Sequence, residues 1–373
     1  SSVAMGVGGV NRRWRSWGWR GGHNTSRRRD FLALVGGAGA LLGAAGGSAC
    51  VPSGFPAPPS APGADGNQRS SPPEAPPLPG RLLYVGGADL WLWEGGTARR
   101  LTGDRVSRQP AWSPDGRWIA HVKIDVSSSD LWVMDDQSAN GRQLTENFSR
   151  ERTKNNWAFR PVWWPDGSRV LYLSDETTYD LMLWHVGADG KGRRALLTVP
   201  DREGGIDGPS VSPDGKRLAA VTFRHPNGRP QVSSFAFPGG PWRPLTDAPE
   251  GAYDPAWSPD GSRLAYVVRQ GGRHDVWLMD AAGPVGAGAV PVTASGAARA
   301  PCWSPDGKWL AFVSGEGGAF EVWVVAVPPA PAPAVTGAAA ATVVPAEPPA
   351  LPPARPLTRG AAVDPQSGLS WTA

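Results

Sequence analysis

The side chains that could do chemistry are few in this sequence and stand far apart. Five His and two Cys occur in 373 residues. His121 and His185 fall in alternating, strand-like stretches, and His225 and His274 lie near separate turn-rich segments. No His-x-His spacing typical of a metal site, no Gly-x-Ser-x-Gly elbow, no Gly-rich phosphate loop and no Cys pair occurs. The sequence therefore predicts no catalytic residue, no metal and no cofactor, and we expect a protein that is not an enzyme.

A five-residue turn motif that ends in Pro-Asp-Gly recurs along the chain. Its copies are Trp112-Ser113-Pro114-Asp115-Gly116, Trp163-Trp164-Pro165-Asp166-Gly167, Val211-Ser212-Pro213-Asp214-Gly215, Trp257-Ser258-Pro259-Asp260-Gly261 and Trp303-Ser304-Pro305-Asp306-Gly307. The Pro residues are 51, 48, 46 and 46 positions apart. This period is typical of a four-stranded propeller blade.

Each copy of the motif predicts a tight hairpin. Pro presets φ for a type I turn, Asp bonds the turn's own backbone, and Gly takes the positive φ that follows. One short strand precedes the turn and an alternating strand follows it. A third strand opens with an acid and an apolar residue, as in Asp130-Leu131, and a fourth begins near Leu-Thr, as in Leu144-Thr145. Gln231 replaces the acid in one repeat, which looks degenerate there.

The ends of the repeat region predict how the ring closes. Residues 81–102 carry the last three strands of a blade, and residues 363–373 are similar to a missing first strand. The fold class is therefore all-β: a six-bladed β-propeller of four-stranded antiparallel blades over residues 81–373, closed by pairing the C-terminal strand with the N-terminal blade. Closure leaves no open sheet edge in the ring. A Pro/Ala-rich insert at 328–354, of a composition typical of disorder, falls between the third and fourth strands of the last blade.

The repeated turn resembles the WD-like Ser-Pro-Asp-Gly repeat of the TolB-like β-propeller family, over residues 81–327 and the C-terminal strand. The resemblance implies six blades and a propeller face that binds protein. TolB itself has an additional N-terminal α/β domain, for which we expect no counterpart in this chain. Some similar propellers are lyases or accompany hydrolase domains. The alternative function is therefore a polysaccharide-acting lyase or hydrolase, or an accessory subunit of a separately encoded enzyme.

The fourth-to-first strand connections of a propeller gather around one mouth of its central channel. Polar residues stand just before the predicted first strands: Arg108, Gln109, Arg160, Asp207, Asp254, Arg299 and Asp364. Convergent polar groups in a concave site favour a ligand- or partner-binding site. Alternatively, these charges pair with one another and cap strand ends.

The longest such connection, residues 146–160, is expected to rim this mouth as a partner loop. It carries Arg150, Arg152 and Trp157, and Arg and Trp are the residue types that most often anchor protein interfaces. Most of the 19 Trp of the chain stand at fixed repeat positions. Core packing therefore explains them better than carbohydrate binding does. Cys302 stands where other repeats have Ala or Val, which predicts a small buried residue.

Residues 1–50 are predicted to be a leader with an export signal. Arg28 and Arg29 precede a short apolar run, which resembles a twin-arginine signal; an ordinary secretory signal is the alternative. The run ends at Gly47-Ser48-Ala49-Cys50, which resembles a lipoprotein cleavage box with Cys50 as the lipidation site. Plain cleavage after Ala49 is the alternative. Residues 51–80 contain ten Pro and are expected to be a disordered linker.

The net charge of +4 does not indicate nucleic-acid binding. Residues 1–30 hold seven Arg and one acid, Asp30, so that the basic charge belongs to the leader and the remainder is near neutral. We predict an exported, lipid-anchored propeller at the outer face of the cell membrane or in the periplasm. It would act as a monomeric protein-binding or scaffolding module of the cell envelope, with a protein or peptide partner at its face and membrane contact through the lipid only.

Overall fold

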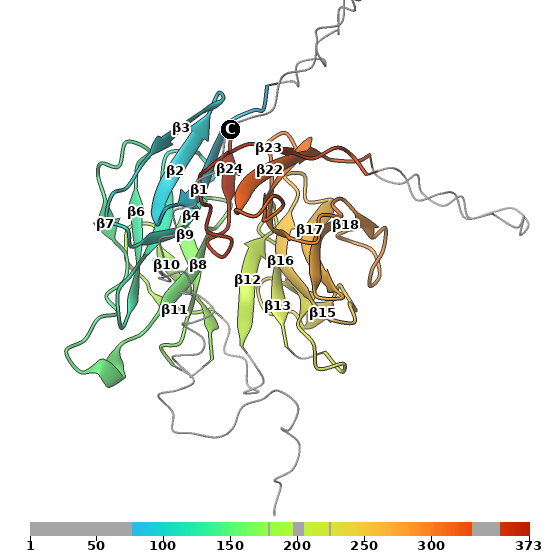
Figure 1. Ribbon diagram of the computed structural model, residues 1–373. Coiled ribbons are helices and arrows are strands. Elements are labelled where there is room, and N and C mark those ends of the chain that lie inside the picture. The colour runs from blue at the N-terminus through green and yellow to red at the C-terminus, as the bar shows by residue number, and fades with distance from the viewer. Residues whose placement is uncertain (1–76, 178–179, 197–204, 224, 330–350) are drawn as a thin grey trace, which may run out of the picture. The chain divides into compact units, whose positions relative to one another are not determined.

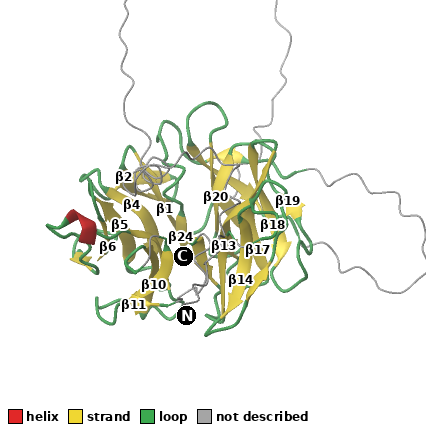
Figure 2. Ribbon diagram, turned by 90° about the horizontal axis from the view of Figure 1, so that it is seen from below, coloured by secondary structure: helices red, strands yellow, loops and turns green. Residues whose placement is uncertain are grey.

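The computed structural model describes residues 77–177, 180–196, 205–223, 225–329 and 351–373. These residues form six four-stranded antiparallel sheets that follow one another around a ring (Figure 1). The expected all-β, six-bladed propeller is confirmed. In the described part of the chain, the one helix is a single 3₁₀ turn, η1 (Arg152–Lys154), at the edge of the blades in Figure 2. The predicted export signal with Arg28 and Arg29, and the predicted lipidation site Cys50, lie outside the described residues.

Every blade places its strands in the same order. The first strands are β4 (Ser107–Trp112), β8 (Ala158–Trp163), β12 (Ile206–Val211), β16 (Ala252–Trp257), β20 (Ala298–Trp303) and β24 (Ser370–Thr372). The second strands are β5 (Ile119–Ile124), β9 (Arg169–Ser174), β13 (Arg217–Thr222), β17 (Arg263–Gln270), β21 (Trp309–Ser314) and β1 (Arg81–Gly86). We number the blades from 1 to 6 in this order.

The outer strands complete the blades. The third strands are β6 (Ser129–Met134), β10 (Met182–Gly187), β14 (Gln231–Ala236), β18 (Arg273–Asp280), β22 (Glu321–Ala326) and β2 (Asp89–Glu94). The fourth strands are β7 (Arg142–Gln143), β11 (Arg194–Ala195), β15 (Trp242–Pro244), β19 (Val290–Pro291), β23 (Arg355–Pro356) and β3 (Thr97–Arg100). The predicted insert falls between β22 and β23, and its residues 330–350 lie outside the described part.

The first strands line the centre of the ring, because each contacts the first strands of both neighbouring blades. Since the strands are antiparallel, the two ends of the ring carry different connections. One end carries the loops between second and third strands and the connections from each fourth strand to the next blade; we call it the channel face. The other end carries the Pro-Asp-Gly turns and the connections between third and fourth strands; we call it the turn face.

The recurring motif forms the turn that its residue types predict. In blade 1 the N–H of Gly116 donates to the carbonyl of Ser113 at 2.9 Å, and Gly116 has φ of 66°. The Ser113 hydroxyl donates to Asp115 and accepts from the N–H of Trp118 at 2.9 Å. The Gly residues of the other four copies have φ between 68° and 71°, a conformation that only Gly adopts without strain.

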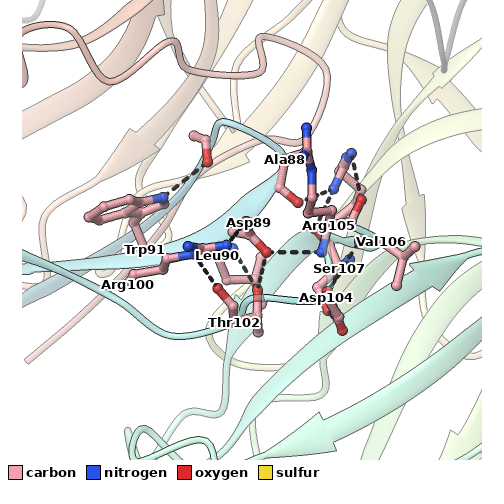
Figure 3. Close-up of polar contacts among 12 residues, drawn as sticks. Ala88, Asp89, Leu90, Trp91, Arg100, Thr102, Asp104, Arg105, Val106 and Ser107 are labelled. Carbon is pink, nitrogen blue, oxygen red and sulfur yellow. Dashed lines mark hydrogen bonds and ion pairs between the residues drawn. The ribbon is translucent and has the colours of Figure 1, made fainter.

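A carboxylate–threonine pair ties the third strand of a blade to the segment after its fourth strand. In blade 6 the Thr102 hydroxyl accepts from the N–H of Leu90 at 3.0 Å and contacts Asp89, whose carboxylate also accepts from Arg100 at 2.6 Å and from the N–H of Arg105 at 3.0 Å (Figure 3). The same arrangement joins Asp130 to Thr145, Gln231 to Thr246, Asp275 to Thr293 and Glu321 to Thr358.

This pair corrects two expectations from the sequence. The Leu-Thr signature does not begin the fourth strand but follows it, because the Thr hydroxyl must reach back to the start of the third strand. The repeat with Gln231 is not degenerate in structure. The Gln231 side-chain oxygen accepts from the Thr246 hydroxyl at 2.8 Å and from the N–H of Ala248 at 2.9 Å, as a carboxylate does in the other blades.

The ring closes through the C-terminal strand, as predicted. β24 pairs antiparallel with β1, with Leu82 opposite Trp371, and Figure 1 shows the red β24 beside the blue β1. The Trp371 indole N–H donates to the carbonyl of Pro79 at 2.7 Å, and the ring of Trp371 is buried among the apolar residues between blades 5 and 6. The two ends of the propeller therefore share one sheet.

Apolar side chains from neighbouring blades fill the space between them. Between blades 1 and 2, for example, Val122 and Leu131 are buried against Tyr172 and Trp184. In the part of the chain that the structure describes, no helix is long and apolar enough to cross a membrane.

Candidate functional site at the channel face

The polar residues predicted at the channel mouth lie within the first strands rather than before them, except Asp364, which precedes β24. β4, β8, β12, β16 and β20 each contain a register shift where the strand bulges. At each bulge the residue before a Pro has a left-handed backbone, with φ between 49° and 54°: Gln109, Arg160, Gly208, Asp254 and Ala300. Bulges re-aim side chains, and a left-handed residue other than Gly carries strain of about 1–3 kcal/mol.

Neighbouring bulges are joined by hydrogen bonds around the ring. The N–H of Arg160 donates to the side-chain oxygen of Gln109 at 2.8 Å. The N–H of Ala300 donates to the carboxylate of Asp254 at 3.2 Å. Gln109 and Asp254 therefore hold the next blade in place, which is the strand-capping alternative that the sequence left open.

Arg160 lies at the centre of the polar ring. Its Nε is 3.4 Å from Asp207 Oδ1 in blade 3, and its Nη1 donates to the carbonyl of Gln366 in blade 6 at 3.1 Å. Burial by itself would lower the pKa of the Arg160 guanidinium, but the carboxylates of Asp207, Asp254 and Asp364 outweigh it and raise this pKa above its ordinary value. Arg160 thus balances three carboxylates from three blades.

A second ion pair joins blades 1 and 6 on the same face. Arg108 Nε is 3.7 Å from Asp364 Oδ2, and its Nη1 donates to the carbonyl of Ala88 at 2.6 Å. Asp364 also accepts from the N–H of Gln366 at 3.0 Å and from the Ser367 hydroxyl at 2.7 Å. The carbonyl of Ala88 lies beside Asp89 (Figure 3). Arg108 therefore joins the polar mouth to the carboxylate–threonine pair of blade 6.

Arg299 differs from the other two arginines of the ring, because it makes no ion pair within the described residues. Its charge acts on His274 in β18. Burial, then the positive charges of Arg299 and Arg269, lower the pKa of His274. Asp207, although paired with Arg160, is 45 % exposed. The ring therefore offers one cation and one carboxylate to a ligand.

The sequence missed the exposed apolar side chains of this face. Val106 and Phe148 lie on connections that lead to first strands, and Val126 and Phe223 lie on loops between second and third strands. Both kinds of connection belong to the channel face. Val126 is 92 % exposed and Phe148 is 62 % exposed, although each alone is ordinary on a protein surface. Four exposed apolar residues therefore lie on connections at this end of the ring.

The predicted partner loop is anchored differently from our expectation. Arg150 is exposed, and Arg152 is in η1. Trp157, however, is only 6 % exposed and stacks on Phe159 with ring centroids 5.7 Å apart. The backbone N–H of Trp157 donates to the carboxylate of Asp175, on the loop after β9, at 2.9 Å. This hydrogen bond holds the indole in its inward position. Trp157 therefore fixes the base of the loop, and Phe148 takes the exposed position that we expected for Trp157.

Burial shifts three titratable groups of the blades toward their neutral forms: His121, His185 and Cys302. Burial lowers the pKa of His121 to about 4 and raises the pKa of the Cys302 thiol to about 12. Burial also lowers the pKa of His185, whose Nε2 accepts a hydrogen bond from Arg194 at 2.8 Å. Among the described residues, no three His, Cys, Asp or Glu side chains gather as metal ligands would.

Comparisons with known proteins agree with this architecture. The family described as TolB beta propeller domain matches residues 178–346. An uncharacterized protein of Agrobacterium fabrum is 29 % identical over 129 residues, which are 35 % of this chain and 40 % of that protein. The Tol-Pal system protein TolB of Anaeromyxobacter dehalogenans is 31 % identical over 109 residues, 29 % of this chain and 23 % of that protein. These matches thus span less than half of the relatives' own length.

The fold is also similar to a solved structure. The crystal structure of TolB from Acinetobacter baumannii superposes with a TM-score of 0.55 at 20 % identity, covering 66 % of this chain and 61 % of that chain. The blade number, the strand order and the repeated turn agree with the sequence matches. The chain thus has the six-bladed β-propeller fold seen in TolB, and its residues 178–346 match the TolB beta propeller domain family.

Proposed function

We propose that this chain is a non-catalytic, protein-binding module of the cell envelope that captures a protein or peptide partner with its channel face. The observation that carries the proposal is that exposed apolar side chains lie on connections of the channel face, the same end of the ring as the polar mouth: Val106, Val126, Phe148 and Phe223. Apolar anchors with a polar surround are the usual composition of a protein interface.

The polar mouth supports the same function. Its ion pairs are long, at 3.4 Å for Arg160 and Asp207 and 3.7 Å for Arg108 and Asp364, so a ligand carboxylate or ammonium group competes with partners that are not tightly bonded. Arg299 and the exposed Asp207 provide one charge of each sign. A peptide, which carries both donors and acceptors, fits such a neutral ring.

Export and anchoring complete the proposal. The leader carries Arg28 and Arg29 before an apolar run and Cys50 after it, and a relative of this chain is named as a protein of the Tol-Pal system. We propose that the propeller works as a monomer outside the cytoplasmic membrane, tethered through a lipid on Cys50. The intact mass of the mature N-terminus tests the tether, because an acylated Cys50 adds the mass of its acyl chains.

The test of partner binding compares two matched surface variants in the full-length protein. Val126→Ser with Phe148→Ser removes apolar area from the channel face, and Val285→Ser removes it from the turn face, where Val285 is 51 % exposed. Co-purifying proteins are quantified by mass spectrometry. The proposal expects a loss of at least about tenfold in specific partners for the first variant only. Equal recovery with both variants contradicts it.

A further inference from the structure

Arginines clamp neighbouring blades together at the turn face. An Arg at the start of a second strand lies over the Trp that ends the first strand of the next blade. These pairs are Arg81 over Trp112 at 4.6 Å, Arg217 over Trp257 at 4.5 Å and Arg263 over Trp303 at 5.3 Å. A guanidinium on an indole face is stabilised by cation–π attraction.

Each clamping guanidinium also finds carbonyl oxygens of the next blade. Arg81 donates to the carbonyl of Gly116 at 2.8 Å, and Arg217 donates to that of Gly261 at 3.3 Å; both Gly end a Pro-Asp-Gly turn. Arg217 also donates to Ala281, and Arg263 donates to Pro328 at 2.9 Å. The repeat thus builds a guanidinium seat from a Trp ring and a turn carbonyl.

The seat between blades 1 and 2 lacks its arginine. Trp118 stands at the position of Arg263, as the alignment of 117–120 with 262–265 shows. Trp163 and Gly167 of blade 2 are in place, but no described arginine lies over Trp163. A side chain built on Gly167 meets nothing within 4 Å, whereas one built on Gly116 meets the Arg81 guanidinium at 2.7 Å.

A pocket of 440 Å³ opens at this place. Trp118 and Trp163 line it together with the turn residues Pro114, Asp115, Pro165 and Asp166. Ligand pockets in proteins start at about 300 Å³, so the volume admits one long side chain and its flanking backbone. The aromatic and acidic lining is suited to a flat cation.

Both carboxylates of the pocket are ionised and only partly used. Asp115 Oδ1 accepts from the Ser113 hydroxyl and from the N–H of Arg117 at 3.1 Å, and Asp166 Oδ1 accepts from the N–H of Ser168 at 2.8 Å. These hydrogen bonds lower the pKa of both carboxyl groups.

Arg142 also lines the pocket, but its guanidinium already contacts residues of blades 1 and 2. It lies over Trp118 at 5.0 Å and donates to the carbonyl of Ala188. Arg99 and Arg243, at the same position of other fourth strands, donate to the equivalent part of their next blades, at Asp136 and Gly283. Among the lining residues one guanidinium stands beside two carboxylates, and Arg117 Nη1 lies 4.0 Å from Asp115 Oδ2.

We propose that this pocket binds an arginine side chain of a protein partner, which would supply in trans the guanidinium that Arg81, Arg217 and Arg263 supply in cis. Arginine fits better than lysine, because a planar guanidinium can pack against the partly exposed ring of Trp118 and donate to the carboxylate of Asp166. The site lies at the turn face and does not depend on the partner proposed for the channel face.

The probes are three acetylated pentapeptides, Gly-Gly-X-Gly-Gly amides with arginine, lysine or citrulline as X, titrated calorimetrically into the propeller at low salt. Citrulline has the shape of arginine without its charge. The arginine peptide is expected to bind at least about tenfold more tightly than the citrulline peptide, with a Kd of about 1 mM or lower, and more tightly than the lysine peptide.

Two variants localise the binding. Trp118→Arg restores the clamp of the repeat, so it should abolish arginine-peptide binding without lowering Tm. Asp115→Asn with Asp166→Asn should weaken binding by at least about tenfold. The matched control, Asp260→Asn with Asp306→Asn, changes the same turn position where blades 3, 4 and 5 meet and should bind as the unaltered protein does.

Several results overturn the proposal. These are no binding of the arginine peptide up to about 10 mM, equal binding of the arginine and citrulline peptides, or undiminished binding by the Trp118→Arg variant provided that it folds with native Tm. If that variant does not fold, the two pairs of Asn variants decide. An equal loss in both pairs would place binding outside this pocket.

Discussion

The Ser370 hydroxyl, three positions from the end of the sequence, accepts a hydrogen bond from the backbone N–H of Trp112 at 2.8 Å. These residues are 258 positions apart and belong to the first strands of blades 6 and 1. Ser210 makes the same contact to Trp257 between blades 3 and 4, at 3.3 Å. The closing strand therefore joins its neighbour in the same way as an ordinary blade does.

Replacing Trp371 with Ala should open this closure. The change removes a buried indole from the core between blades 5 and 6 and the hydrogen bond to Pro79. The expected loss in the free energy of unfolding is about 3–5 kcal/mol, measured by urea denaturation. Ser370→Ala should cost about 1 kcal/mol. A Trp371→Ala protein with unaltered stability would show that the ring does not depend on β24.

Thr145 should contribute more to stability than its size suggests. Its hydroxyl accepts from the N–H of Leu131 at 2.9 Å and donates to Asp130 at 3.0 Å. Thr145→Val keeps the shape but leaves a buried N–H without a partner, at a cost of about 1–3 kcal/mol. Thr97→Val, at an exposed position of β3, is the control and should change little. Similar Tm values for the two variants would mean that the hydrogen bonds of Thr145 do not stabilise the blade.

His121 should make the propeller acid-sensitive. It is 2 % exposed between blades 6 and 1, near Lys123 and Asp104, and burial followed by the charge of Lys123 lowers its pKa to about 4. The unfolded chain, with a His pKa near 6.5, binds a proton that the folded chain does not. Stability should therefore fall as the pH drops from about 6.5 to about 4, by about 3 kcal/mol in total.

His121→Phe isolates this effect, since Phe312 stands at the same position in blade 5. The difference in unfolding free energy between the two proteins is measured from pH 7 to pH 4. It should grow in favour of the Phe variant as the pH falls. Parallel curves over this range would mean that the folded chain protonates His121 as readily as the unfolded chain does.

Removing the guanidinium of Arg160 should leave the carboxylates of the mouth to repel one another. Arg160→Gln leaves Asp207, Asp254 and Asp364 without a shared cation, and the expected destabilisation is about 1–2 kcal/mol at low salt because the site is partly exposed. Added salt should recover part of it, and a second change, Asp207→Asn, should do the same. A loss that is independent of salt and of Asp207 would point to packing alone.

Local chemistry explains what the sequence could predict. The Pro-Asp-Gly turns, the repeat period and the match between residues 363–373 and the other first strands each depend on residues that are close in the chain. The sequence position of Arg108, Arg160 and Asp364 near the first strands also brings them to the channel face, and their role in binding stays a prediction.

The features that the sequence did not predict depend on contacts between residues that are distant in the chain. The pairing of Asp130 with Thr145 joins two signals that looked independent, since one opens a strand and the other follows one. The burial of Trp157 and the exposure of Phe148 depend on how the loop packs on its neighbour, where the Asn155 side chain donates to Ser127 at 2.8 Å. No local pattern distinguishes an aromatic residue that anchors a loop from one that stands on it.

The central claim is that the channel face meets the partner, and site-specific photo-crosslinking in the native envelope tests it most directly. A photoreactive amino acid replaces Phe148 in one protein and Val285, at the turn face, in another, and the adducts are identified by mass spectrometry. We expect a specific protein adduct from position 148 that is missing from position 285. Adducts from position 285 alone, or the same adducts from both, would contradict the account.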